Sequence, residues 1–137
     1  MKIFFDSSAF VKRFIEEDGS REVDAWCERA SRLGLSILCI PEMVSALNRK
    51  IREGELSTEH YWPIKEQIAK EIEDAQIVEL TPEVVEKSIG LLERHVLRSL
   101  DALHIACALA WGADVFVSSD KRQIRASRDS GLAVRFL

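Results

Sequence analysis

The sequence has few cysteines and no long apolar run, and each absence narrows what the chain can be. Its three cysteines, Cys27, Cys39 and Cys107, are odd in number, far apart and set among apolar residues. Such spacing favours neither a disulfide framework nor a zinc cluster, and we expect three buried thiols. No stretch approaches the ~18 apolar residues of a membrane span, and no signal-peptide pattern opens the chain. We therefore expect a soluble, cytoplasmic protein with no membrane partner.

An excess of positive charge and several well-known motifs are lacking as well. The net charge of −4 argues against a general nucleic-acid-binding surface, because such surfaces carry a strong basic excess. Basic residues do gather locally, at 49–52 and 121–128, so a basic rim is compatible with this balance. No G-x-G-x-x-G follows a predicted strand, which disfavours a dinucleotide-binding protein. Asp6 is followed by two serines rather than by the second acid of a haloacid-dehalogenase-type phosphatase, and the paired acids of a response-regulator receiver are missing too.

What is present is a regular alternation of short apolar runs and helical patterns. The chain has 137 residues, of which 47% are hydrophobic and 31% charged, as expected for one domain with its own core. Predicted strands lie at residues 3–5, 35–40, 76–80, 113–117 and 132–136, and the third, being the least hydrophobic, is predicted near an edge. Strands alternating with helices of this kind form right-handed βαβ crossovers. We expect one α/β domain over residues 1–137, with a central twisted parallel sheet of about five strands flanked by helices on both faces.

Capping residues predict where the helices begin and end. Ser7 and Ser8 supply capping hydroxyls for the first helix, and Ser99 does so for a helix over the following residues. Gly34 is predicted to end the second helix, and Pro41 to occupy the first position of the third. These assignments place the acidic residues of the chain relative to the sheet.

Four acids occupy equivalent places in this pattern. Asp6 and Asp120 follow predicted strands, whereas Glu42 and Asp101 lie in the first turns of predicted helices. The carboxyl ends of parallel strands and the starts of the helices that follow share one edge of the sheet, so distant residues can meet there. Asp101 fits this argument least directly, because another helix precedes its own. Each acid alone can be a turn former or a helix-dipole partner, and only the combination indicates a site.

Converged carboxylates need a cation. Two charges ~5 Å apart repel by roughly 3 kcal/mol at an effective dielectric of ~20. Hard oxygen ligands without cysteine or histidine favour Mg²⁺ or Mn²⁺ over zinc. A water whose pKa is lowered by such an ion can attack a phosphodiester. Three serines, Ser7, Ser118 and Ser119, are placed to orient waters or carboxylates around the acids.

The presence of other polar residues near the acids can be explained either by a function or by structure alone. Five basic residues are candidate RNA contacts that can equally be solvated surface charges or ion-pair partners: Lys12, Arg98, Lys121, Arg122 and Arg125. Arg98 in particular is expected to pair with a surface acid rather than with a phosphate. His104, one turn beyond Asp101, is predicted to be a packed or hydrogen-bonded helix residue rather than a metal ligand.

Four segments together resemble the motifs of a known family. They are D-S-S-A-F-V-K-R-F-I-E-E-D-G-S from Asp6, P-E-M-V-S-A-L from Pro41, L-D-A-L-H-I-A-C-A from Leu100 and V-S-S-D-K-R from Val117. In this order and spacing they are similar to PIN-domain nucleases, particularly the VapC-type toxins of prokaryotic toxin–antitoxin pairs. Each motif alone is weak, whereas the ordered set spans essentially the whole chain and is specific.

The resemblance implies a site and an activity. The family pattern puts metal-binding acids at Asp6, Glu42, Asp101 and Asp120, with Ser118 as its hydroxyl, and so supports the acid that topology places least securely. It implies a Mg²⁺- or Mn²⁺-dependent endoribonuclease that hydrolyses RNA phosphodiester bonds, forms a homodimer and is inhibited by a small antitoxin protein covering the active-site groove. The alternative is a catalytically silent PIN-like module that binds protein or RNA. Metal titration distinguishes the two, because a silent module need not bind Mn²⁺.

Overall fold

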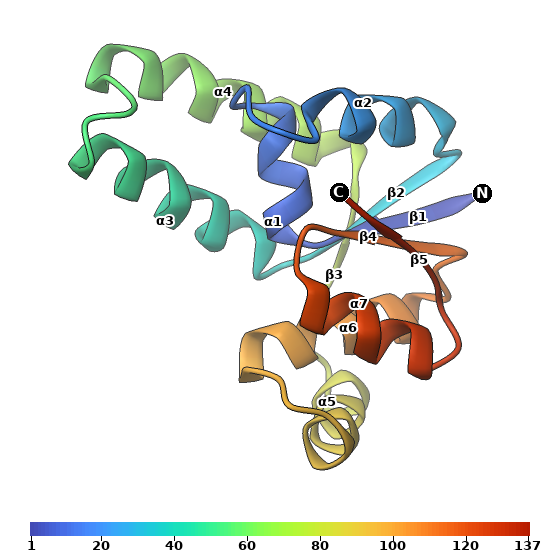
Figure 1. Ribbon diagram of the computed structural model, residues 1–137. Helices are drawn as coiled ribbons and strands as arrows, with labels where there is room; N and C mark the ends of the chain where they lie inside the picture. The colour runs from blue at the N-terminus through green and yellow to red at the C-terminus, as the bar shows by residue number, and fades with distance from the viewer.

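Five short apolar segments form one sheet in the computed structural model, which describes residues 1–137 (Figure 1). The strands are β1 (Lys2–Phe5), β2 (Arg32–Ser36), β3 (Gln76–Val78), β4 (Val115–Ser118) and β5 (Ala133–Phe136). Their order across the sheet is β3-β2-β1-β4-β5, and every neighbouring pair is parallel. The predicted α/β fold with a five-stranded parallel sheet is therefore confirmed, and β3 lies at an edge as its composition predicted.

Helices cover both faces of this sheet. They are α1 (Ser7–Phe10), α2 (Ser20–Arg29), α3 (Cys39–Arg52), α4 (Thr58–Asp74), α5 (Pro82–Arg94), α6 (Ser99–Trp111) and α7 (Lys121–Asp129), with a 3₁₀ turn at Val11–Arg13. α1 to α4 lie on one side, where α3 and α4 extend together beyond the sheet, and α5 to α7 lie on the other (Figure 1). No helix in the structure has the length and apolar character needed to cross a membrane.

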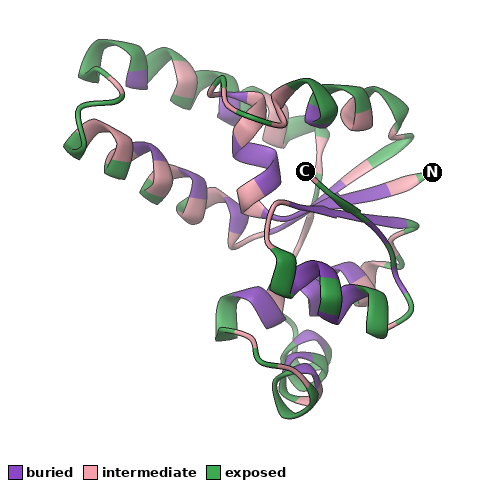
Figure 2. Cartoon of the chain, in the orientation of Figure 1, coloured by how far each residue is buried: buried purple, intermediate pink, exposed green.

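The central strand β1 contributes side chains to two separate hydrophobic cores. Ile3 and Phe5 belong to the core beneath α1 to α4, whereas Phe4 belongs to the core beneath α5 to α7. All three are 0% exposed, and Figure 2 shows buried residues concentrated on the sheet and on the helix faces turned toward it. Because successive strand residues point to opposite faces, a strand covered on both sides must be apolar throughout. Each such side chain stabilises the fold by about 1.5–3 kcal/mol, which explains why the run Ile3–Phe5 is uninterrupted.

The second strand lies earlier in the sequence than predicted. It spans Arg32–Ser36, so Gly34 lies inside the strand rather than ending a helix, and α3 already begins at Cys39. The ring of Trp111 packs directly on Gly34, and a Cβ there would lie 2.7 Å from its Cζ3 atom. Glycine is required at this close approach. The apolar run 35–40 spans the end of a strand and the first turn of a helix, which a short apolar pattern does not separate.

Two predicted helix caps are also corrected. Asp6, not Ser7 or Ser8, caps α1, because its Oδ1 accepts a hydrogen bond from the Ala9 N–H at 3.0 Å. At α6 the capping position is Arg98, with no side-chain cap, and Ser99 is the first helical residue. The serines after Asp6 therefore keep their hydroxyl groups for other contacts.

The cysteines are free, and the prediction that they are buried holds for two of them. Cys39 and Cys107 are buried, whereas Cys27 is only partly covered. Burial raises the pKa of the Cys27 thiol to about 11, so this cysteine is protonated at neutral pH. None of the three is an activated thiol.

The strand order indicates where a ligand-binding crevice lies in this fold. The chain passes from β1 to β2 on one side, while β4 pairs with β1 on the other. Ligands of open α/β sheets bind where the strand order reverses in this way, beyond the carboxyl ends of the strands. Asp6 follows β1 directly and Ser118 ends β4, so both lie at this point.

Candidate active site

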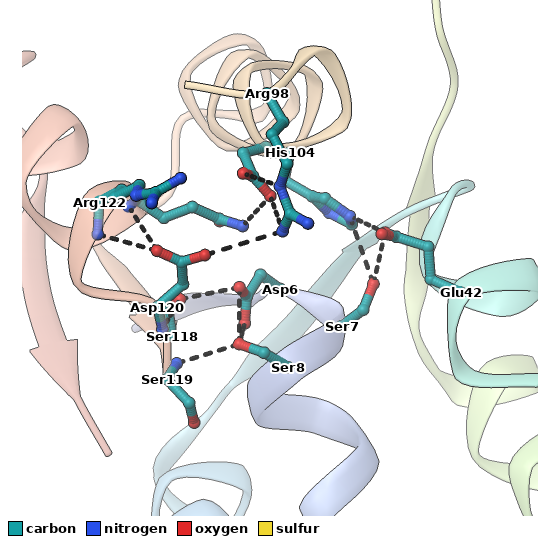
Figure 3. A network of polar contacts seen from close by, with 12 residues as sticks. Asp6, Ser7, Ser8, Glu42, Arg98, His104, Ser118, Ser119, Asp120 and Arg122 are labelled. Carbon is teal, nitrogen blue, oxygen red and sulfur yellow. Dashed lines mark hydrogen bonds and ion pairs between the residues drawn. The ribbon is translucent and has the colours of Figure 1, made fainter. Parts of the chain in front are cut away.

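Asp6 forms the floor of the crevice between β1 and β4 (Figure 3). The residue is 1% exposed, and its carboxylate accepts hydrogen bonds from Ser8 Oγ at 2.8 and 2.9 Å, Ser118 Oγ at 2.8 Å and the Ala9 N–H at 3.0 Å. The ion pairs of the crevice involve the other acids but not Asp6. Burial raises the pKa of Asp6 above its ordinary value, although the nearby His104 and these hydrogen bonds act in the opposite direction. A buried carboxylate without a cationic partner is the form a cation-binding group takes before its ion arrives.

The end of β4 joins Asp120 to this floor. Ser118 Oγ donates to Asp6 and accepts from the Asp120 N–H at 2.9 Å. Asp120 Oδ1 caps α7 by accepting from the backbone N–H groups of Arg122 at 2.8 Å and Gln123 at 3.3 Å. The other oxygen, Oδ2, lies 4.0 Å from a nitrogen of Arg98, so one side of the carboxylate is held and the other faces the crevice.

The neighbouring segment of β4 is held through its backbone. The Ser119 N–H donates to Ser8 Oγ at 3.1 Å, whereas the Ser119 hydroxyl has no hydrogen-bond partner. Ser8 thereby links this loop to Asp6, and the Ser119 hydroxyl orients no carboxylate in this structure.

Asp101 reaches the crevice from the other face of the sheet. Its side chain is 5% exposed and accepts from Arg98 Nε at 3.0 Å and from Gln123 Nε2 at 2.9 Å. The same guanidinium lies within 4.0 Å of Asp120, and its hydrogen bond to Asp101 raises the pKa of Arg98. Two of the four acids are therefore bridged by a positive charge. Arg98 pairs with an acid as expected, but its hydrogen-bonded partner Asp101 is buried rather than on the surface.

Glu42 lines the opposite side of the crevice, in the first turn of α3. Its Oε1 accepts from Ser7 Oγ at 2.8 Å and contacts His104 Nε2 closely. Desolvation raises the pKa of Glu42, but the hydrogen bonds and charges of His104, Ser7 and Arg98 outweigh it, so the net pKa is lowered. His104 is buried and its Nδ1 has no partner. The nitrogen facing the carboxylate therefore carries the hydrogen, and His104 fixes the position of Glu42.

The structure brings the four predicted acids to one crevice, but not into mutual contact. Ser118 links Asp6 to Asp120, Arg98 links Asp120 to Asp101, and Ser7, next to Asp6, contacts Glu42 (Figure 3). No three acidic, histidine or cysteine side chains are close enough to share one ion directly. Mg²⁺ usually keeps several waters and takes only one or two carboxylates. The all-oxygen donor set and the uncompensated charge of Asp6 thus fit a hydrated hard cation.

The basic residues predicted to contact RNA divide into two groups. Lys12 lines the crevice on the side of α3, together with Arg49 and Lys50. Lys121, Arg122 and Arg125 line a separate pocket on the side of α7. Arg98 lies between these groups, at the acids.

The roles of Ser8 and Gln123 in the site were not predicted from the sequence, nor was the partner of His104. Ser8 was assigned only to capping, and Gln123 carried no signal at all. His104 is the packed, hydrogen-bonded residue predicted, but its partner Glu42 is 62 positions away and follows from no local pattern. The available signal was spacing, because residues three apart on a helix share a face, and His104 shares that face with Asp101.

Comparisons with known proteins agree with this geometry. The family model of the PIN domain matches residues 3–129. The ribonuclease VapC45 of Mycobacterium tuberculosis is 33% identical over 120 residues, covering 80% of this chain and 76% of the relative. The crystal structure of M. tuberculosis VapC20, described as a sarcin-ricin loop cleaving toxin, has a TM-score of 0.70 at 16% identity and covers 96% of each chain. A toxin–antitoxin complex from Klebsiella pneumoniae has a TM-score of 0.65 at 13% identity over 89% of each chain. With these matches the resemblance seen in its motifs is confirmed, and the chain belongs to the PIN domain family.

Proposed function

We propose that this protein is a metal-dependent endoribonuclease that hydrolyses RNA phosphodiester bonds in the cytoplasm, as the toxin of a toxin–antitoxin pair. In this proposal residues 1–137 act as one nuclease domain. The observation that carries it is the buried Asp6 carboxylate at the strand-order reversal, with three hydrogen-bond donors and no cation paired to it. Membership of the PIN domain family and the similarity to ribonuclease VapC45 support the same conclusion.

Asp6, Asp101 and Asp120 are the residues that would hold Mg²⁺ or Mn²⁺, with Glu42 completing the site from α3. When bound, such an ion stabilises negative charge on phosphate oxygens and lowers the pKa of water. The Ser119 hydroxyl contacts none of the acids and has no role in this proposal. The hydroxyls of Ser7 and Ser118 donate to the carboxylates of Glu42 and Asp6 and hold them in place. They are therefore assigned to positioning rather than to proton transfer.

The other roles in RNA hydrolysis belong to residues that position the acids or lie beside them. Ser8 and Ser118 fix both oxygens of Asp6. His104 and Ser7 hold Glu42, whose lowered pKa keeps it ionised at neutral pH. An ionised carboxylate at the mouth of the crevice can accept a hydrogen bond from an attacking water. Asp101 and Asp120 would hold the ion, and Arg98, whose side chain is 74% exposed, would then be available to bind a phosphate of the substrate.

The proposed function is tested with purified protein and single-stranded RNA. We expect internal cleavage in Mg²⁺ or Mn²⁺ and none in EDTA. Calorimetric titration with Mn²⁺ is expected to give saturable binding that disappears in Asp6→Asn. A protein that neither binds Mn²⁺ nor cleaves RNA would be the silent binding module instead.

An antitoxin is part of the proposal. Several solved structures of the same fold are toxin–antitoxin complexes, which supports a small protein partner covering the acidic crevice. A short open reading frame beside this one, whose product co-purifies with the chain and abolishes cleavage, is the expected finding.

A homodimer is supported by one exposed apolar stripe on α5. Val85, Ile89 and Leu92 are 43%, 51% and 36% exposed, and Val96, just past the helix, is 88% exposed. Val85, Ile89 and Leu92 lie four and three residues apart, so they share one face of α5, and a second copy related by a two-fold axis meets the same face. Two-fold interfaces use one self-complementary patch in this way.

Ile89→Glu is expected to halve the mass measured by light scattering, because it places charges at the centre of that interface. Glu86→Lys, on the same helix outside the stripe, serves as the control and should stay dimeric. A wild-type monomer at micromolar concentration would contradict the dimer without affecting the active site.

A further inference from the structure

A pocket lined by cations lies beside the active site, on the side of α7. It is formed by the end of α5 with the segment that follows, and by the first two turns of α7. We call it the basic pocket, and its lining residues are Arg94, His95, Val96, Lys121, Arg122, Arg125 and Ala126. Lys121 and Arg122 follow Asp120 directly in the chain, so the pocket adjoins the acids. Figure 3 shows Arg122 beside Asp120, at the end of the site opposite Glu42.

The cations of this pocket are not neutralised by the protein. The side chains of Arg94, Lys121, Arg122 and Arg125 are exposed, and none takes part in any ion pair of the chain. Among the lining residues, only His95 contacts an acid, at 4.0 Å from Asp129. Like charges gathered in one concavity repel each other and attract anions. In a chain of net charge −4, such a cluster indicates that a bound ligand, rather than the protein, provides the neutralising anion.

The opposite side of the crevice differs in this respect. Lys12 and Lys50 share Glu17 at 3.6 and 3.9 Å, and Lys50 also pairs with Glu55 at 3.2 Å. Arg49 is the one cation of that side without an acidic partner. Unpaired positive charge is therefore concentrated on the α7 side of the acids.

We propose that the basic pocket is a phosphate-binding subsite for the RNA strand on one side of the cleaved bond. The inference rests on the proposed ribonuclease function and adds the path of the substrate: the strand passes from the acids over the first turns of α7, rather than along α3. Phe136 of β5 supports this path, because it is 50% exposed and the centroid of its ring lies 5.8 Å from Lys121 Nζ. A cationic groove with an aromatic face beside it is the usual form of a single-strand binding surface.

The test measures RNA binding without cleavage. The probe is a fluorescently labelled single-stranded RNA of about eight nucleotides, titrated in EDTA by anisotropy over a range of salt concentrations. The pocket variant Arg94→Gln/Arg122→Gln/Arg125→Gln is expected to bind about tenfold more weakly. Its slope of log affinity against log salt should be shallower by about 2, since each phosphate contact on a single strand contributes about 0.7.

A charge-matched variant separates local binding from net charge. Arg21, Arg52 and Lys70 are exposed and unpaired on other elements, and replacing all three by Gln changes the net charge equally. This control is expected to bind within about twofold of wild type and to keep the wild-type salt slope. Equal losses in the two triple variants would overturn the subsite. Should the pocket variant fail to fold, Arg122→Gln and Arg125→Gln alone are each expected to weaken binding by about twofold to threefold.

The outcomes for the subsite and for the proposed function are distinct. RNA binding that depends on the pocket, without cleavage in Mn²⁺, would leave the subsite standing and refute the nuclease. Cleavage by a pocket variant that binds RNA as wild type does would refute the subsite alone. The subsite would also be overturned if the wild type bound no RNA. The same holds if the pocket variant lost the binding of a protein partner but kept the binding of RNA.

Discussion

Asp6→Asn is expected to lose RNA cleavage by about 10²–10³-fold or more while the protein stays folded. The carboxylate lies at the floor of the site and is 1% exposed, and none of the other acids is in contact with it, so we expect none of them to replace it. Asparagine has the same shape and keeps an oxygen that can accept from the Ala9 N–H, as Asp6 does at 3.0 Å. The cap of α1 is therefore retained, and the loss is expected in cleavage rather than in folding.

The same substitution is expected to stabilise the metal-free protein at pH 7. Burial raises the pKa of Asp6 in the folded state above its ordinary value of 3.8, so the folded protein binds this proton more tightly than the unfolded chain does. The resulting stability is fully present below pH 3.8 and is lost as the pH rises through the folded-state pKa. At neutral pH the wild type bears the cost of an ionised buried group, and Asp6→Asn does not.

Urea denaturation in EDTA between about pH 4 and pH 8 measures this difference. The unfolding free energies of wild type and Asp6→Asn should be closest at the acidic end and diverge as the pH rises, with the variant more stable. Mn²⁺ should then raise the stability of the wild type but not of the variant. Asp6→Ala, which loses the helix cap, is the matched control and should be less stable than Asp6→Asn. Cleavage by Asp6→Asn at the wild-type rate would remove the proposed site.

The sequence predicts some of these residues well, and the reason is local. Asp6 and Asp120 follow apolar strands, and Glu42 opens a helix after a strand, so the edge they share follows from the parallel sheet. Asp101 was placed by resemblance, although a topological reason exists. α6 leads directly into β4 through a turn at Gly112. A helix that precedes a parallel strand runs opposite to it, and its start therefore lies at the carboxyl edge.

Contacts between distant side chains could not be predicted in this way. The contact of Arg98 with Asp120 and the contact of His104 with Glu42 join segments far apart in the chain, whereas Arg98 and Asp101 are only three residues apart. Both long-range contacts depend on rotamers and on the packing of α6 and α7 rather than on periodicity. The bounds of β2 were predicted wrongly, because the position of Gly34 is fixed by Trp111, on a different element.

Asp101→Asn is expected to abolish cleavage to a similar extent and yet to destabilise the protein, unlike Asp6→Asn. Asp101 accepts from Arg98 Nε at 3.0 Å and from Gln123 Nε2 at 2.9 Å, each on a different carboxylate oxygen. An asparagine can serve only one of these donors as acceptor and turns its own N–H₂ toward the other. Rotation of the Gln123 amide can present its Oε1, which has no partner in the structure, to this N–H₂, but the ion pair with Arg98 is lost, at a cost of about 1 kcal/mol.

The origin of that loss is tested by a double-mutant cycle with Arg98→Gln, read by urea denaturation in EDTA. Because the Arg98 side chain is 74% exposed, Arg98→Gln alone should cost at most about 1 kcal/mol. In the Asp101→Asn background it should cost almost nothing, since the pair is already broken. Additive losses would mean that Asp101 is held by Gln123 and by packing instead. We expect both variants to lose cleavage, with Asp6→Asn more stable and Asp101→Asn less stable than the wild type. This result would show that Asp6 is a buried charge without a cationic partner, whereas Asp101 is neutralised by the protein itself.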